Sequence, residues 1–111
     1  MNNHESYNNA AEKELKKYLS QKGESLKRLL VVEPSGCLIF VDVEEDKVSL
    51  KELQRLVDGY IELYPKRDTK FQYIVDEEGL LKNKPYNRLA KELFDVDVVG
   101  SLVLCPTGLF D

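Results

Sequence analysis

The sequence lacks most of the residues that enzymes use to activate a nucleophile. It contains a single histidine, His4, which lies in a polar, asparagine-rich start. A Ser–His or Cys–His pair inside a folded domain is therefore not expected. The 6 glycines are scattered, and none has the G-x-x-x-x-G-K-S/T or G-x-G-x-x-G spacing of a phosphate-binding loop. We therefore expect a non-enzymatic protein that uses no cofactor.

Residues that bind metals are also scarce. The 2 cysteines, Cys37 and Cys105, are far apart and each adjoins an apolar run, so we expect reduced, buried thiols and no zinc site. Acidic residues gather at 44–46, 76–79 and 95–97. We interpret these groups as a solvated loop, a turn and a set of caps, because none has the alternating oxygen ligands of a calcium loop. Two carboxylates can perform acid–base catalysis, but the spacing brings no such pair together.

Long hydrophobic runs and an excess of positive charge are missing too. The longest apolar run spans residues 37–41, whereas a helix needs ~20 apolar residues to cross a bilayer. The start has no basic region followed by an apolar stretch, so we expect a cytoplasmic protein without membrane association. The 16 Lys and Arg residues are interspersed with 20 Asp and Glu residues, for a net charge of −4. Without a basic stripe, direct nucleic-acid binding is not expected.

The sequence does contain regularly spaced apolar residues within 111 residues, a length that predicts one domain. Helical spacing occurs at 10–22, 49–58 and 85–94, and strand-like patterns occur at 26–33, 37–43, 60–64, 71–75 and 98–104. The pattern predicts a single compact α+β domain in the order α-β-β-α-β-β-α-β, with two to three helices and a mixed, mostly antiparallel sheet of about five strands. We assign residues 1–25 to a polar tail and an amphipathic helix, and residues 26–111 to the α+β domain.

Helix boundaries are marked by specific residues. Ser49 and Glu52 match a capping box, in which the serine hydroxyl accepts from the Glu52 amide and the Glu52 carboxylate reaches back to the Ser49 amide. Gly59 is expected in the left-handed position that ends this helix. Pro85 fits the first turn of the last helix, because its missing N–H would be unpaired there in any case.

The predicted N-terminal helix has a narrow apolar stripe. Ala11, Leu15, Tyr18 and Leu19 share one face, while lysines and a glutamate occupy the others. A helix of this kind either lies on the domain or pairs with a second copy of itself. A homo-oligomer is therefore one of two expectations for this helix.

Polar side chains on one predicted strand form the first part of a candidate binding site. Tyr60, Glu62 and Tyr64 alternate with apolar residues, so they share one strand face. Tyrosine offers a ring for stacking and a hydroxyl for hydrogen bonding, and Tyr73 on the partner strand adds another. The other interpretation is a solvent-facing strand surface on which tyrosine satisfies β-propensity.

Asn87 and Arg88 form the second part of the candidate site. Arg88 lies in the first turn of its predicted helix, where the helix dipole disfavours a cation. Together, Asn87 and Arg88 are suited to hold a carboxylate or phosphate beside free helical N–H groups. The alternative is structural: Arg88 pairs with Glu62, Glu92 or Asp76 and fastens the helix to the sheet.

At these residues the chain resembles an uncharacterised family of domains that occurs in phages, plasmids and conjugative elements of Gram-positive bacteria. The resemblance covers residues 27–105, and its matching segments are 29–34 (LLVVEP), 56–62 (LVDGYIE), 76–79 (DEEG), 85–88 (PYNR) and 98–104 (VVGSLVL). The family has no assigned active site. The resemblance implies an accessory protein of a mobile element, a class that often acts on host machinery, including defence systems.

Two hypotheses for function follow from the residues and the resemblance. The first is a protein that binds and inhibits or modulates a host protein. The second is a small-molecule binder that sequesters a nucleotide-type immune signal in a cleft near Tyr60, Glu62 and Arg88. Both hypotheses describe a binding protein without catalysis, and they differ in the partner.

Overall fold

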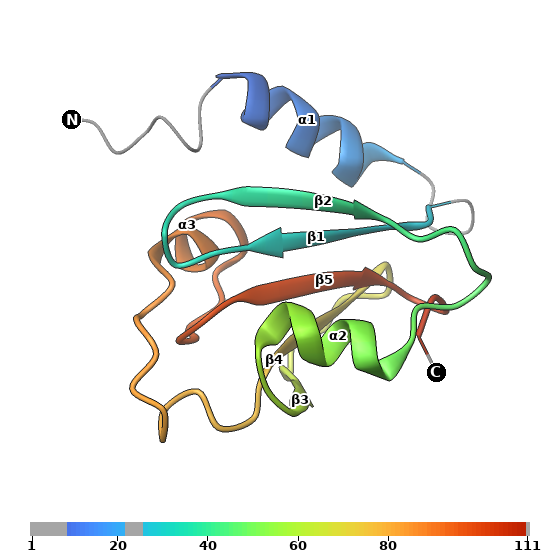
Figure 1. The fold of residues 1–111 in the computed structure, drawn as a ribbon. Coiled ribbons are helices and arrows are strands. Elements are labelled where there is room, and N and C mark those ends of the chain that lie inside the picture. Colours follow the sequence, from blue (N-terminus) through green and yellow to red (C-terminus); the bar gives the residue numbers. More distant parts are fainter. Residues whose placement is uncertain (1–8, 22–25, 111) are drawn as a thin grey trace.

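The computed structural model describes residues 9–21 and 26–110, and it contains three helices and a five-stranded sheet (Figure 1). In chain order the elements are α1 (Asn9–Ser20), β1 (Arg28–Val32), β2 (Leu38–Asp42), α2 (Leu50–Val57), β3 (Ile61–Leu63), β4 (Phe71–Asp76), α3 (Arg88–Phe94) and β5 (Leu102–Pro106). The predicted α+β class and element order are confirmed. Of the predicted polar tail, residues 1–9, the first eight residues lie outside the described residues and Asn9 begins α1. None of the described helices has the length and apolar character needed to cross a membrane.

The sheet has the strand order β2-β1-β5-β4-β3, and each neighbouring pair is antiparallel. The predicted hairpin of the first two strands is present, with Arg28 opposite Asp42 and Val32 opposite Leu38. The last strand, β5, lies between β1 and β4, so all of its residues are buried. The two edges of the sheet are β2 and β3.

Each face of the sheet has its own hydrophobic core. Leu30 and Leu104 belong to a cluster that includes residues of α1 and α3, whereas Leu29 and Val103 belong to a cluster that includes residues of α2. Neighbouring residues fall into different clusters because successive side chains of a strand point to opposite faces. The helices therefore cover both faces, with α1 and α3 on one and α2 on the other.

Helix α1 packs on the sheet, which is the first of its two predicted arrangements. The ring of Tyr18 lies 5.4 Å from that of Phe71 and 5.5 Å from that of Phe40, between ring centroids. The Tyr18 hydroxyl donates to the backbone carbonyl of Arg28 at 2.6 Å, which satisfies its polar atom inside the core. The helix ends at Ser20, before the predicted end at residue 22, which lies outside the described residues.

Helix α2 begins as predicted, but only half of the capping box forms. The Ser49 hydroxyl accepts from the Glu52 amide at 3.1 Å. The Glu52 carboxylate does not reach back to Ser49; it binds the Arg55 guanidinium through two contacts of 2.9 Å. An arginine three residues later competes successfully because a paired carboxylate–guanidinium contact is stronger than a single bond to an amide.

The start of α3 and the start of β5 both differ from the prediction. Pro85 precedes the helix, which begins at Arg88 with Asn87 as its N-cap. Tyr86 and Val99 pair in an isolated antiparallel bridge, so the chain between Pro85 and Asn87 is extended. Gly100 then takes a left-handed conformation (φ 79°), which separates this bridge from β5 and delays the strand from the predicted residue 98 to residue 102.

Candidate functional site

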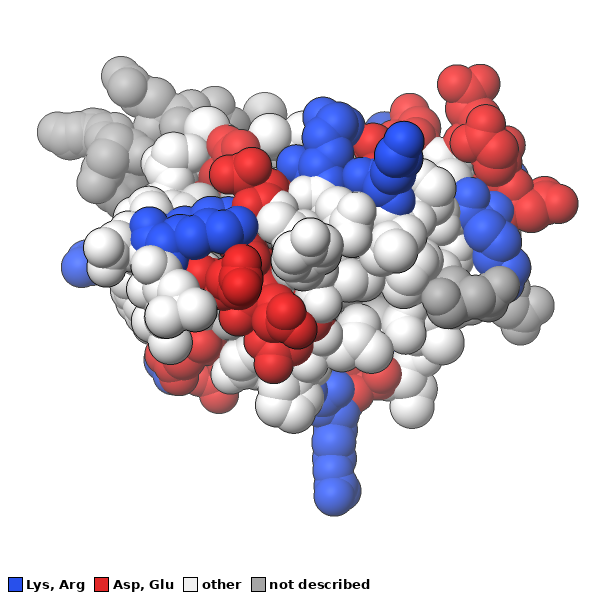
Figure 2. All heavy atoms as spheres, turned by 60° about the horizontal axis from the view of Figure 1, so that its bottom comes forward, with Lys and Arg blue, Asp and Glu red and all other residues white. Residues whose placement is uncertain are grey.

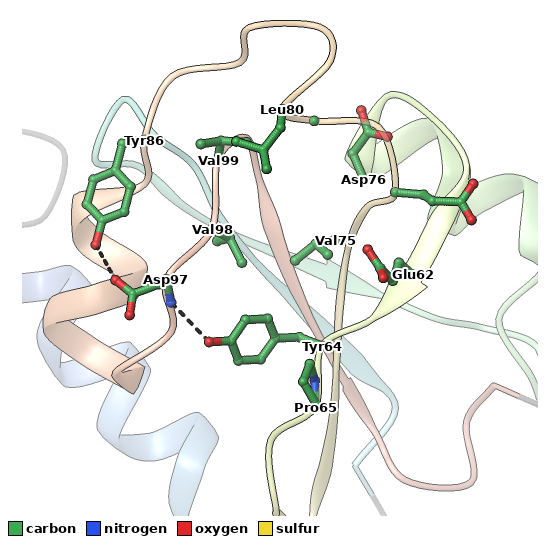
Figure 3. A pocket seen from close by; sticks show the side chains of 12 residues that line it. Glu62, Tyr64, Pro65, Val75, Asp76, Leu80, Tyr86, Asp97, Val98 and Val99 are labelled. Atoms are coloured by element: carbon green, nitrogen blue, oxygen red, sulfur yellow. Dashed lines mark hydrogen bonds between the residues drawn. The ribbon is translucent and has the colours of Figure 1, made fainter.

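A groove of about 450 Å³ lies beside β3, on the sheet face that α1 and α3 cover. In Figure 3, Val75 and Val98 lie in its centre, with Leu80 and Tyr64 at opposite ends. Its lining residues come from β3, the loop that follows it, β4 and the two loops that flank α3: Glu62, Tyr64, Pro65, Val75, Asp76, Glu77, Gly79, Leu80, Tyr86, Asp97, Val98 and Val99. The groove therefore has an apolar floor with tyrosines and carboxylates around it.

The alternation of β3 places two predicted site residues in the groove. Glu62 lies directly opposite Val75 in the ladder with β4, so both side chains point to the same face. Tyr64 follows two residues later, on the same side of the strand. The predicted shared face is thus present for Glu62 and Tyr64, and both residues line the groove.

Asp97 organises one wall of the groove through three hydrogen bonds. Its backbone N–H donates to the Tyr64 hydroxyl at 3.3 Å, and its carboxylate accepts from the Tyr86 hydroxyl at 2.8 Å (Figure 3). Lys91 contacts the second carboxylate oxygen at 3.3 Å. The bonds from Tyr86 and then Lys91 lower the pKa of Asp97, and the bond to Asp97 raises the pKa of Tyr86. The wall therefore presents an ionised carboxylate and a protonated phenol, not an activated nucleophile.

The groove carries negative charge. Four acidic residues line it, and no Lys, Arg or His does. Glu62 and Glu77 form no ion pair with another described residue. On the face shown in Figure 2, charges of both signs are interspersed with uncharged surface and form no continuous basic area. A ligand in the groove would meet carboxylates, so the groove favours a cation over an anion.

Asp76 differs from the other three acids, because it is both buried and paired with two lysines inside the protein. Its side chain is 0% exposed and accepts from Lys82 at 2.9 Å, from Lys84 at 2.7 Å and from the Glu78 amide at 2.9 Å. Burial on its own would raise the pKa of Asp76, but these hydrogen bonds outweigh burial and lower the pKa to about 2. Asp76 is therefore an internal anchor and not a ligand-binding carboxylate.

The same two lysines bind the end of α2. Lys82 and Lys84 donate to the backbone carbonyl of Asp58 at 2.9 and 3.0 Å, and Lys84 also donates to the carbonyl of Val57 at 2.7 Å. These carbonyls lack partners within the helix, and a cation is favoured at a helix C-terminus. The loop after β4 is thereby fastened to α2.

Asp58, and not Gly59, takes the left-handed position that ends α2 (φ 58°). Glycine at 59 meets a different requirement. A Cβ atom on Gly59 would lie 2.5 Å from the Asp76 carboxylate and 2.6 Å from the Lys82 ammonium. The glycine is needed for close approach to the buried ion cluster, which the sequence pattern of a helix end does not reveal.

Asn87 has a structural role. It is fully buried, its side-chain oxygen accepts from the Ala90 amide at 3.0 Å, and its amide group donates to the carbonyls of Val32 (2.8 Å) and Gly100 (2.9 Å). The side chain therefore caps α3 and joins it to β1 and to the turn before β5. With these polar groups already paired, Asn87 has none directed toward a ligand.

The other predicted site residues lie apart from the groove. Tyr73 is buried, and its hydroxyl donates to Asp68 at 2.8 Å. Tyr60 is 65% exposed and lies with residues of α2. Arg88 is exposed, and it forms none of the expected pairs with Glu62, Glu92 or Asp76 within the described part of the chain. Of the predicted site residues, Glu62 and Tyr64 are therefore the two that line the groove.

Sequence reasoning missed Leu80 and Leu81, which lie in the loop after β4. Their exposed fractions are 80% and 83%, the highest of the large hydrophobic residues in the described chain. The signal was available: two adjacent leucines occur in a turn-forming segment that has neither strand nor helix periodicity. Such residues cannot be assigned to a core face of a strand or helix.

Among residues 9–21 and 26–110, no group of three or more His, Cys, Asp or Glu side chains is arranged to hold a metal ion. The fold is that of a small α+β domain with one antiparallel sheet. The chain belongs to the family described as a domain of unknown function, DUF3846, whose profile matches residues 27–108. No curated protein and no solved structure matches the chain. Helix α1 precedes the matched region.

Proposed function

We propose that this protein is a non-enzymatic binding module that docks a segment of another protein in the groove beside β3. The observation that carries the proposal is the exposure of two adjacent leucines: Leu80 (80%) lines the end of a groove with an apolar floor, and Leu81 (83%) follows it in the chain. Large exposed apolar side chains beside a concave surface are typical of protein-binding sites.

The charge of the groove favours a protein partner over a nucleotide-type signal. Glu62, Glu77 and Asp97 line the groove, and a phosphate there would be repelled by all three carboxylates. The residues that suggested an anion site, Asn87 and Arg88, do not line it. A partner that carries Lys or Arg would instead be attracted.

The state of the potential nucleophiles supports a non-enzymatic role. Burial raises the pKa of the Cys105 thiol to about 12, so it stays protonated. Burial raises the pKa of Tyr73, as does its bond to Asp68, and the bond to Asp97 raises that of Tyr86. None of these groups is activated in the way that covalent catalysis requires.

The family resemblance supplies the context of the proposal. We place the protein among the accessory proteins of phages or other mobile elements, and its partner among the proteins of the bacterial host cytoplasm, including those of defence systems. In this role the protein would inhibit or modulate its partner by occupying a surface, which requires no catalytic residue.

Affinity capture from a host lysate tests the proposal. We expect the wild-type protein to retain a stoichiometric partner, and the double variant Leu80→Asp/Leu81→Asp to lose it, because each aspartate would have to be desolvated in an apolar interface. The matched control is Leu50→Asp, which alters another exposed leucine (48%) at the start of α2, where an acid is tolerated. Equal capture by the double variant and the control would contradict the proposal.

A further inference from the structure

Within residues 9–21 and 26–110, no strand pairs with the outer edge of strand β3. It lies at the end of the sheet, with β4 as its neighbour on the inner side. The carbonyl of Tyr60 and the N–H of Tyr64, at either end of β3, both hydrogen-bond toward β4, at 2.8 and 2.7 Å. Backbone groups alternate in direction along a strand, so the N–H and C=O groups of Ile61 and Leu63 point outward. The edge therefore offers donors and acceptors to an added strand.

The side chains around this edge determine which kind of strand can pair with β3. Glu62 is central in β3 and lines the groove, whereas Leu63 is 54% exposed and Ile61 is partly buried on the opposite sheet face. A second copy paired antiparallel about Glu62 would place two unneutralised carboxylates opposite each other, which is destabilising. A basic residue in that position would instead be attracted by Glu62 and by the other groove carboxylates.

We propose that the protein recognises an extended basic segment of its partner, which adds to β3 as a sixth strand. The residue opposite Glu62 is Lys or Arg, with its side chain over the groove, and the residues on either side of it are apolar and contact Ile61 and Leu63. Backbone hydrogen bonds provide affinity and the alternating side chains provide specificity, as in other cases of strand addition. This inference rests on the proposed function and names the chemistry of its partner.

Synthetic peptides test strand addition directly. The probe is an acetylated and amidated heptapeptide of alternating lysine and valine, and its control has glutamate in place of lysine. We expect the lysine peptide to bind about tenfold more tightly than the glutamate peptide, because opposite charges across a strand pair attract and like charges repel. Glu62→Lys should reverse this order. Equal affinity of the two peptides for the wild-type protein would overturn the inference.

A second measurement reports on the backbone. Binding should slow hydrogen exchange at the amides of Ile61 and Leu63, which point outward in the free protein. Leu63→Pro removes one outward N–H without touching the bonds to β4, and proline is tolerated on an edge strand, so it should weaken binding about tenfold relative to Leu63→Val. If Leu63→Pro perturbs the fold, N-methylation of the peptide at alternate residues should weaken binding equally. Unchanged exchange in the bound state would overturn strand addition.

The two proposals fail in different ways. If the Leu80→Asp/Leu81→Asp variant loses its partner but neither peptide binds at about 1 mM, strand addition is wrong and the docking groove stands. If the lysine peptide binds with protection of the Leu63 amide but capture does not depend on Leu80 and Leu81, the proposed function is wrong and the basic-strand site stands.

Discussion

Replacement of Asp76 by asparagine should remove the main electrostatic anchor of the loop after β4. The substitution preserves shape but removes the charge that Lys82 and Lys84 share, and it turns an amide N–H₂ toward at least one of these donors. Lys82 is 38% exposed and can turn to solvent, whereas Lys84 is only 15% exposed and stays beside the carbonyls of α2. Most of the lost stability should therefore come from Lys84, which would remain buried without its carboxylate partner.

The magnitude follows from the pKa of Asp76, which is lowered from 3.8 to about 2. Each pKa unit corresponds to about 1.4 kcal/mol, so ionised Asp76 stabilises the native state by roughly 2.5 kcal/mol at neutral pH. We expect Asp76→Asn to lower the free energy of unfolding by about 2–3 kcal/mol and the melting temperature by roughly 10 °C. Urea denaturation followed by circular dichroism measures the difference.

The pH dependence of this difference tests its origin. A lowered pKa means that the stabilisation is present above the unfolded-state pKa of 3.8 and disappears as the pH falls through the native value of about 2. The gap between wild type and Asp76→Asn should therefore be constant from pH 7 to pH 5 and shrink from pH 4 toward pH 2. Glu77→Gln, which changes the adjacent exposed acid, is the control and should stay within about 0.5 kcal/mol of wild type. A gap below about 1 kcal/mol at pH 7, or one that persists at pH 2, would refute the reasoning.

Three further outcomes follow from the contacts described above. Asn87→Ala should destabilise the protein by about 2–4 kcal/mol in urea, because it removes a helix cap and two buried hydrogen bonds to backbone carbonyls; a loss below about 1 kcal/mol would contradict this role. Tyr86→Phe should raise the pKa of Asp97 toward its ordinary value with little change in stability, and an unchanged carboxyl titration by NMR would show that the hydroxyl does not contact Asp97 in solution. Gly59→Ala should lower the melting temperature, because the added methyl would lie 2.5 Å from Asp76, and a melting temperature at or above that of wild type would be inconsistent with this packing.

The elements could be predicted because their signals are local. The Ser49 cap and the hairpin turn at 34–36 depend on residues within a few positions of one another, and both occur where expected. The alternation that places Glu62 and Tyr64 on one face is also local, with a period of two. Predictions of this kind need no knowledge of which strands are neighbours.

The groove could not be predicted in the same way, because its residues come from four separate parts of the chain, at 62–65, 75–80, 86 and 97–99. These residues meet because β5 lies beside β4. The order of strands in a sheet cannot be predicted from the hydrophobic periodicity of any single strand or helix. The role of Lys84 could not be predicted for a similar reason. The residues next to it in the sequence are those of an ordinary surface lysine, whereas the groups that it binds lie at residues 57, 58 and 76. Asn87 was misinterpreted because Pro85 offered an earlier start for the helix.

The position of β5 has a consequence for the order in which the chain folds. The hairpin of β1 with β2 and that of β3 with β4 each join strands that are close in sequence, so each can form early. Among the described strands, the two hairpins are linked only through β5, which bonds to β1 on one side and to β4 on the other. On a ribosome, the two hairpins therefore stay separate until residues 102–106 have emerged, and the inner edges of β1 and β4 stay unpaired until β5 joins them.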